Sequence, residues 1–265
     1  MPDRLRFSVT DAPGLEGLQQ EYEPFRAALE EILQTTVEFF PVEDYFMAAS
    51  ALQSGQVDLV WAGPSEYVAV RARTSATPIV SLVRSTYRTI IAARSDSGIQ
   101  SLADLKGKTL DMWKLGSTAG QLGAAIMLME AGLNPQTDVK AIFTEDNTLT
   151  PLKTGAAAAW ARPFNRYQPA IEQEGAAATD YPIIAEGATL PGDVFVLASQ
   201  LGSELAIAIQ SQMLANAEKL MTAIRAVESL AERFGNGELT QGNDADYDVL
   251  REAYRAIGQG DFLQQ

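Results

Sequence analysis

The sequence predicts an α/β protein folded as two lobes. Segments with the alternating pattern of strands are separated by segments with helical spacing, which is typical of βαβ units and a mainly parallel, doubly wound sheet. The chain has 265 residues, enough for two lobes of ordinary size. Two strand-like segments, near 87–93 and 193–198, lie where the chain can cross between lobes. We expect residues 1–91 and 191–265 to form one lobe and residues 92–190 an inserted second lobe.

The first lobe is predicted from repeated strand–helix pairs that end at glycine or proline. The expected strands are 5–9, 36–40, 57–61 and 78–83, and the expected helices are 21–33, 45–54 and 66–72. The C-terminal segments 204–234 and 246–257 have helical spacing and are assigned to the same lobe. The acidic residues Glu238, Asp244, Asp246 and Asp248 are predicted to form a solvated loop.

The second lobe is predicted from shorter elements. The expected strands are 87–93, 109–113, 138–143, 156–160 and 181–185, and the expected helices are 99–105, 122–129, 149–153 and 164–174. Ligands bind at the carboxyl ends of strands in sheets of this kind. Two such lobes joined by two strands would therefore leave a ligand-binding cleft between them.

Composition excludes several classes of function. The chain has 20 basic and 34 acidic residues, a formal charge of -14, and neither histidine nor cysteine. Thiol catalysis, Ser-His-Asp chemistry and zinc sites with His or Cys ligands are therefore excluded. The negative charge repels nucleic acid and anionic membranes. We expect no metal, no cofactor, no catalytic residue and no nucleic-acid partner.

The localisation is predicted from what the N-terminus lacks. Met1 to Arg4 lead straight into a strand, without the basic and apolar regions of a signal peptide. No uninterrupted apolar run approaches the ~20 residues of a membrane span, so direct membrane insertion is not expected. We expect a periplasmic or lipid-anchored extracytoplasmic protein if a leader was removed, and a cytoplasmic protein otherwise.

The segment 107–133 carries the pattern of a small-anion site. Residues 109–113 are predicted to form a strand, Gly116-Ser117-Thr118-Ala119-Gly120 a loop, and 122–129 a buried helix. The first turn of a helix has about four unpaired N–H groups and the positive end of the helix dipole. The alternative is a helix capped by Ser117 or Thr118 with glycines for close packing. No GKS or GKT follows, so this is not a nucleotide P-loop.

Four segments resemble the PhnD-like phosphonate- and phosphite-binding proteins of ABC importers. They are VEDYFMAASALQSGQVDLVWAGPSEYV, STYRTIIAARSDSGIQSLADLKGKTL, GSTAG and LPGDVFVLAS. The resemblance covers roughly residues 5 to 200. It implies the two-lobed type-2 periplasmic-binding-protein fold with two hinge strands. It also implies capture of a small tetrahedral oxyanion, of the phosphite or alkylphosphonate class, for a membrane permease.

The same resemblance implies a set of ligand contacts. The phosphonyl group would be held by the helix start, and two tyrosines and one acid would complete the site. The implied residues are Ser117, Thr118, Ala119, Tyr45, Tyr87 and Asp193, with Gly116 in the same loop. Asp193 beside an oxyanion would need a proton on one partner, which predicts binding that weakens as pH rises.

The sequence departs from the family pattern at several positions. Glu145 stands where the family often has histidine, and Asn165 stands near the place of an amine-binding acid. Ala119 lacks the third hydroxyl. These changes predict a ligand without an amine, with phosphite or methylphosphonate ahead of phosphate. Arg162 is a candidate oxyanion contact; the alternative places it with Arg166 on a surface helix, paired with Glu172 or Glu174.

Two other functions remain open at this point. An enzyme on the same fold would need an acid, base or nucleophile, and Glu145, Asp193 and Lys114 are the candidates. A cytoplasmic ligand sensor would keep the fold without a permease partner. Turnover of a bound compound would distinguish the enzyme from a binding protein.

Overall fold

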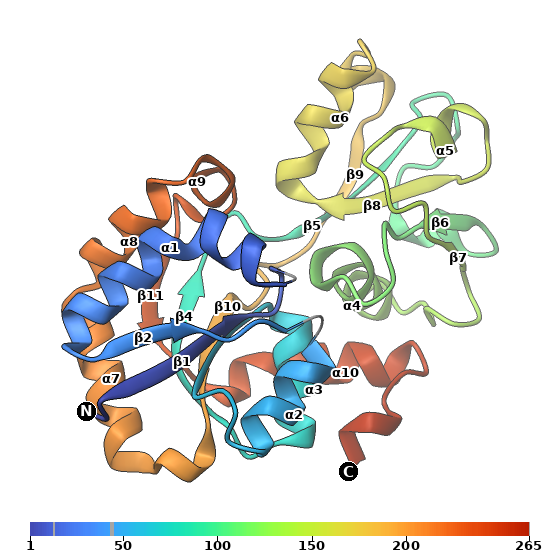
Figure 1. The fold of residues 1–265 in the computed structure, drawn as a ribbon. Coiled ribbons are helices and arrows are strands. Elements are labelled where there is room, and N and C mark those ends of the chain that lie inside the picture. Colours follow the sequence, from blue (N-terminus) through green and yellow to red (C-terminus); the bar gives the residue numbers. More distant parts are fainter. Residues whose placement is uncertain (13, 43–44, 265) are drawn as a thin grey trace. The chain divides into compact units, whose positions relative to one another are not determined.

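A computed structural model describes residues 1–12, 14–42 and 45–264. The chain forms two compact units, which are described here one at a time (Figure 1). The first unit consists of residues 1–85, 191–247 and 262–265. The second unit consists of residues 86–190 and 248–261. No helix in the described part of the chain is long and apolar enough to cross a membrane.

The first unit is built on a six-stranded mixed sheet. Its strands lie in the order β11-β4-β10-β3-β1-β2. They are β1 (Arg4–Val9), β2 (Thr36–Phe39), β3 (Leu59–Ala62), β4 (Thr77–Val83), β10 (Asp193–Leu197) and β11 (Glu238–Gln241). β1 is parallel to β2 and β3, whereas β10 is antiparallel to both β3 and β4, and β11 to β4. The predicted parallel arrangement therefore holds for β1 to β4, which share one direction, but not for β10 and β11, which run opposite to the strands they join.

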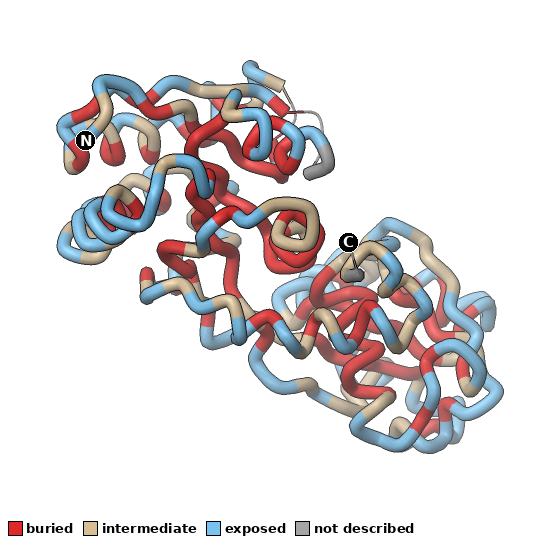
Figure 2. Tube along the Cα trace, turned by 90° about the horizontal axis from the view of Figure 1, so that it is seen from below, coloured by how far each residue is buried: buried red, intermediate tan, exposed pale blue. Residues whose placement is uncertain are grey.

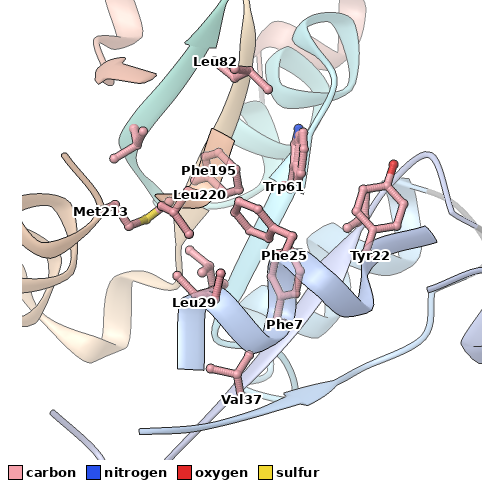
Figure 3. Packing of buried hydrophobic residues seen from close by; sticks show 14 of the residues in the cluster. Phe7, Tyr22, Phe25, Leu29, Val37, Trp61, Leu82, Phe195, Met213 and Leu220 are labelled. Carbon is pink, nitrogen blue, oxygen red and sulfur yellow. The ribbon is translucent and has the colours of Figure 1, made fainter. Parts of the chain in front are cut away.

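The helices of the first unit bury aromatic side chains against this sheet. They are α1 (Gly14–Leu33), α2 (Tyr45–Gln53), α3 (Pro64–Arg73), α7 (Ser203–Ala215), α8 (Ala217–Arg225) and α9 (Glu228–Phe234). Phe25 of α1 stacks on Phe195 of β10 with ring centroids 5.4 Å apart, and Trp61 of β3 lies 4.9 Å from Phe195 (Figure 3). These three rings are at most 1% exposed, so they form the centre of this core.

The second unit has a five-stranded sheet in the order β7-β6-β8-β5-β9. The strands are β5 (Thr89–Ala93), β6 (Thr109–Asp111), β7 (Lys140–Ile142), β8 (Ala159–Pro163) and β9 (Ile183–Glu186). β6 is parallel to β7 and β8, and β5 is antiparallel to β8 and β9. Since β6, β7 and β8 are parallel, the loops after these three strands leave from the same edge of the sheet.

Both faces of the second sheet are covered. Its helices are α4 (Gly123–Glu130), α5 (Thr150–Lys153), α6 (Tyr167–Gln173) and α10 (Asp248–Ala256). Along β5, Ile91 and Ala93 pack in one cluster with α4, whereas Ile90 and Ala92 pack in another with Trp160 and residues of α6. Alternate residues of a strand point to opposite faces, so two cores require an apolar residue at every position. Figure 2 colours buried residues red, and they gather inside each of the two units.

The unit boundaries differ from the predicted ones at two places. The chain leaves the first unit after Ser85, whereas the sequence analysis placed this crossing after residue 91. The segment 248–261 belongs to the second unit, although it was predicted in the first lobe. The reason is that α10 packs on α4, with Leu250, Ala253 and Tyr254 buried. Periodicity shows that a helix has an apolar face but not which unit covers it.

Two local assignments also need correction. Glu238 was predicted in a solvated loop, but it begins β11, a short edge strand that pairs with β4. The strand expected at 156–160 lies instead at β8, three residues further on. This shift places Arg162 inside a central strand rather than beside a surface helix.

Candidate functional site

The Gly-Ser-Thr loop is the start of a helix in the second unit. Ser117 is the N-cap of η2 (Thr118–Leu122), a single π-helical turn that continues into α4. The Ser117 hydroxyl oxygen accepts a hydrogen bond from the Gly120 N–H at 3.0 Å. The Ser117 carbonyl accepts from the N–H groups of both Gln121 and Leu122 at 2.9 and 3.1 Å. The capping interpretation is therefore confirmed for Ser117.

Close packing holds this helix start on β5. The Thr89 hydroxyl donates to the Ala119 carbonyl at 2.7 Å, and both residues are buried. A Cβ atom at Gly123 would lie 1.9 Å from the Thr89 hydroxyl oxygen, so any side chain there would push the helix away from the strand. Gly123 is therefore required for the position of the Ser117–Gly120 turn.

The Ala119 N–H of the helix start has no partner among the described residues. The Gly116 N–H donates to the Gln121 side chain at 2.7 Å, and the Gly120 N–H is taken by Ser117. The Ala119 N–H donates to no oxygen of the described residues, although Ala119 is only 1% exposed. A buried donor without a partner costs about 1–3 kcal/mol. The first turn of this helix can therefore stabilise an added acceptor, an anion above all.

Three loops meet at the carboxyl edge of the second sheet. They follow β6, β7 and β8 and carry Trp113, Glu145 and Arg166 respectively, with Arg166 at the end of a short 3₁₀ turn that begins directly after β8. Trp113 and Glu145 both have positive φ, 58° and 59°, and the Glu145 N–H donates to the Trp113 carbonyl at 2.9 Å. The Trp113 ring lies 5.5 Å from the Arg166 guanidinium and 5.7 Å from the Lys114 ammonium. Two cations and an aromatic ring thus lie in the loops next to Ser117.

Arg162 makes a buried ion pair and is not on a surface helix. Its Nη2 lies 2.8 Å from Asp111 Oδ2, and both side chains are 0% exposed. The same nitrogen donates to the Asp146 carbonyl at 3.0 Å, and Thr144 donates its hydroxyl to Asp111 at 2.8 Å. Burial lowers the pKa of Arg162, while the negative charge of Asp111 opposes that change. The predicted partner Glu174 pairs instead with Lys153 at 2.5 Å, so that alternative is wrong.

Asp193 is neutralised by two arginines of its own unit. It is 1% exposed at the start of β10, with Arg84 Nη2 at 2.8 Å and Arg233 Nη2 at 3.6 Å. Burial raises the pKa of Asp193, and both arginines act to lower it. The protein itself therefore supplies the positive charge that balances this carboxylate. The inference from Asp193 that the ligand must carry a proton loses its physical basis.

A pair of acidic residues lies at the carboxyl edge of the first sheet. Asp11 follows β1, and Glu66 is in the first turn of α3 after β3. Glu66 Oε2 accepts from the Gly63 N–H at 2.9 Å and from the Thr10 hydroxyl. Burial and the negative charge of Asp11 raise the pKa of Glu66 to about 8. The sequence analysis missed this pair; its only signal is an acid shortly after each of two neighbouring strands.

The remaining predicted residues lie as follows. Tyr45 begins α2 of the first unit, but its side chain lies outside the described part of the structure. Tyr87 is half-buried just before β5, not in a strand, and its carbonyl accepts from the Leu190 N–H at 2.8 Å. Glu145 is exposed in the loop after β7, and Asn165 is exposed in the 3₁₀ turn η3 (Phe164–Arg166) of the second unit. The structure thus brings Gly116, Ser117, Thr118 and Ala119 together in one turn.

Several solved structures share this fold. XAC2383 from Xanthomonas citri bound to ATP gives a TM-score of 0.72 at 16% identity, over 98% of each chain. PhnD1 from Prochlorococcus marinus in complex with methylphosphonate gives 0.67 at 18% identity, over 98% of this chain and 100% of that one. The periplasmic aliphatic sulphonate binding protein SsuA from Escherichia coli gives 0.63 at 14%, over 100% and 90%. The predicted two-lobed binding-protein fold is therefore confirmed.

Sequence comparison identifies the family to which the chain belongs. Over 139 residues the chain is 28% identical to the phosphate-import protein PhnD of Mycolicibacterium smegmatis, which is 50% of this chain and 43% of that protein. The match thus spans less than half the length of this relative. A sequence model of the phosphonate periplasmic substrate-binding proteins of ABC transporters matches residues 15–247. Because that match covers most of the chain, the protein belongs to this family of ABC-transporter substrate-binding proteins.

Proposed function

We propose that this protein captures a small tetrahedral oxyanion, of the phosphite or alkylphosphonate class, and delivers it to the membrane permease of an ABC importer. Family membership supports the transport role. The observation that carries the choice of an oxyanion is the buried Ala119 N–H in the Ser117-capped helix start, which has no partner among the described residues. This proposal needs no catalytic residue, and binding followed by release is the whole reaction.

Local donors must hold the anion, because the protein as a whole repels it. The chain has a net charge of -14, so long-range attraction cannot bring an oxyanion to the site. Backbone N–H groups, the hydroxyls of Ser117 and Thr118 and the nearby cations Lys114 and Arg166 are a sufficient local source of positive potential. An oxyanion on these donors exchanges bonds to water for bonds to fixed dipoles, which need little reorganisation on binding.

The ligand class is argued from the charges of the predicted contact residues. A solved structure in complex with methylphosphonate and one of a sulphonate-binding protein share the fold, and a sequence relative is named for phosphate import, so the fold alone does not choose among these ligands. Asn165 is neutral and Asp193 is already paired with Arg84 and Arg233. Neither offers a free carboxylate to an alkylammonium group. The proposal therefore favours phosphite and methylphosphonate over aminoethylphosphonate.

Thr118→Val tests the oxyanion site, because valine keeps the shape of threonine and removes the hydroxyl. One hydrogen bond to a charged group contributes about 1.5–3 kcal/mol, so affinity for the best-bound probe should fall by about tenfold to a hundredfold. Calorimetry with phosphite, methylphosphonate, phosphate, sulfate and aminoethylphosphonate measures this directly. Thr150→Val, the same change at the start of α5 in the same unit, is the matched control and should bind normally.

Two results would contradict the proposal. Unchanged affinity in Thr118→Val, with wild-type melting temperature, would place the anion elsewhere. Chemical conversion of a bound probe, followed by phosphorus NMR over hours, would show an enzyme on this fold instead of a binding protein.

A further inference from the structure

We propose that Trp113 is a specificity-determining residue that contacts the substituent on the phosphorus atom of the bound ligand. This inference rests on the proposed function, because it assumes an anion at the Ser117–Gly120 turn. It adds a residue that the family resemblance does not assign. Three independent observations support it: the position of Trp113 beside that turn, its strained backbone, and the cations on its ring.

The first observation is the contact between Trp113 and the helix start. A Cβ atom built on Gly120 would lie 2.9 Å from the Ser117 hydroxyl oxygen and 3.0 Å from the Trp113 Cβ. Trp113 and Ser117 therefore border the same space, and only the lack of a side chain at Gly120 lets them approach so closely. An anion on the Ser117 hydroxyl is then within reach of the indole.

The second observation is the backbone of the loop. A positive φ of 58° is rare for a bulky residue such as tryptophan and is costly unless its surroundings hold it. Here the Met112 N–H donates to the Ile142 carbonyl and the Glu145 N–H to the Trp113 carbonyl, both at 2.9 Å. These bonds tie the loop after β6 to the loop after β7. The loop therefore holds Trp113 in a strained conformation, and strain of this kind is concentrated at binding sites.

The third observation is the environment of the ring. Lys114 and Arg166 both lie within cation–π distance of the Trp113 ring, at 5.7 and 5.5 Å. Lys114 follows Trp113 in the loop after β6 and Arg166 comes from the short turn after β8, so both add positive charge next to the ring. Of the three tryptophans, Trp61 and Trp160 are at most 1% exposed, whereas Trp113 is only partly buried. Trp113 is thus the indole with surface left to offer a ligand.

This arrangement divides recognition between two groups. The helix start recognises the oxygen atoms, which phosphite and phosphonates share. The indole recognises what differs between them, hydrogen in phosphite and a carbon chain in alkylphosphonates. Each carbon group that leaves water against an apolar face changes affinity by about fourfold.

The test compares phosphite, methylphosphonate and ethylphosphonate in the wild type, Trp113→Ala and Trp113→Phe by calorimetry. Trp113→Ala should weaken ethylphosphonate by about fourfold to tenfold more than phosphite, and Trp113→Phe should restore much of that difference. Leu115→Ala is the matched control, because Leu115 is 60% exposed in the same loop and should have no effect. Melting temperatures show that each variant is folded.

Tryptophan fluorescence is the second readout. Saturating ligand should shift the emission of the wild type, and Trp113→Phe should abolish that shift because Trp61 and Trp160 are buried in the cores. Equal weakening of all three ligands by Trp113→Ala, or an emission shift that survives in Trp113→Phe, would overturn the role of Trp113 and leave the oxyanion site standing. Failure of the wild type to bind any of the probes would overturn the proposed function, and this inference with it.

Discussion

Replacing Asp111 by alanine is expected to lower the free energy of unfolding by about 3–5 kcal/mol. The change leaves the Arg162 guanidinium fully buried without its carboxylate, and the ion pair measures 2.8 Å at 0% exposure on both sides. An uncompensated buried charge keeps its desolvation cost and loses the attraction that offset it. Urea denaturation followed by tryptophan fluorescence measures the loss. Trp160 is a local reporter, since its ring lies 4.5 Å from the Arg162 guanidinium.

The control is the exposed pair of Arg94 and Asp96 in the same unit. Their atoms are 2.6 Å apart, but the side chains are 38% and 67% exposed. Water screens a solvent-exposed pair, so Asp96→Ala should change stability little. Replacing both members of the buried pair, Asp111→Leu with Arg162→Met, should recover part of the loss, because no buried charge remains. Similar losses for Asp111→Ala and Asp96→Ala would contradict this account.

Glu66→Gln is expected to flatten the dependence of stability on pH. The pKa of Glu66 is about 8 in the folded protein and 4.5 in its unperturbed state. Between these values the folded state holds a proton that the unfolded state has lost, so the stability contributed by Glu66 falls as pH rises through this range. The slope is at most about 1.4 kcal/mol per pH unit for one proton. Glutamine resembles the protonated acid, so it should remove this slope.

The measurement is urea denaturation of both proteins at several pH values from 5 to 9. The groups around Glu66 are the Asp11 carboxylate, the Thr10 hydroxyl and the Gly63 N–H. Glutamine can accept from the last two and donate to Asp11, so the variant should match the wild type near pH 5 and exceed it near pH 9. Glu16→Gln, on the exposed first turn of α1, is the control. Parallel pH profiles for wild type and Glu66→Gln would show that Glu66 titrates normally.

The helices and strands could be predicted from the sequence because each of them depends on residues that are close together in the chain. Alternation in β1, helical spacing in α1 and the capped turn at Ser117 depend on residues a few positions apart. The Gly-Ser-Thr loop was predicted at a helix start and the structure places it there. The sequence alone therefore determined the α/β class, and the family motifs within it indicated the binding-protein fold.

Charge partners were decided by the tertiary structure. Asp193 and Arg84 are 109 positions apart, and Arg162 and Asp111 are 51 positions apart. Nothing in the local sequence of Asp193 distinguishes a ligand contact from a buried ion pair. The same limit explains the error for Arg162. The strand lies three residues further along the chain than predicted, which moves Arg162 from a surface position into the core. Its partner Asp111 comes from the neighbouring strand β6.

Strand direction and unit membership were also outside the reach of the sequence. A strand has the same pattern whether its neighbour runs parallel or antiparallel, so β10 and β11 looked like any other strands or loops. The apolar face of α10 could be predicted from its sequence. The helix α4, which covers this face, lies more than a hundred residues earlier in the chain. Short-range periodicity determines which surface a segment buries. What buries it is set by packing between distant segments, which only the folded chain brings together.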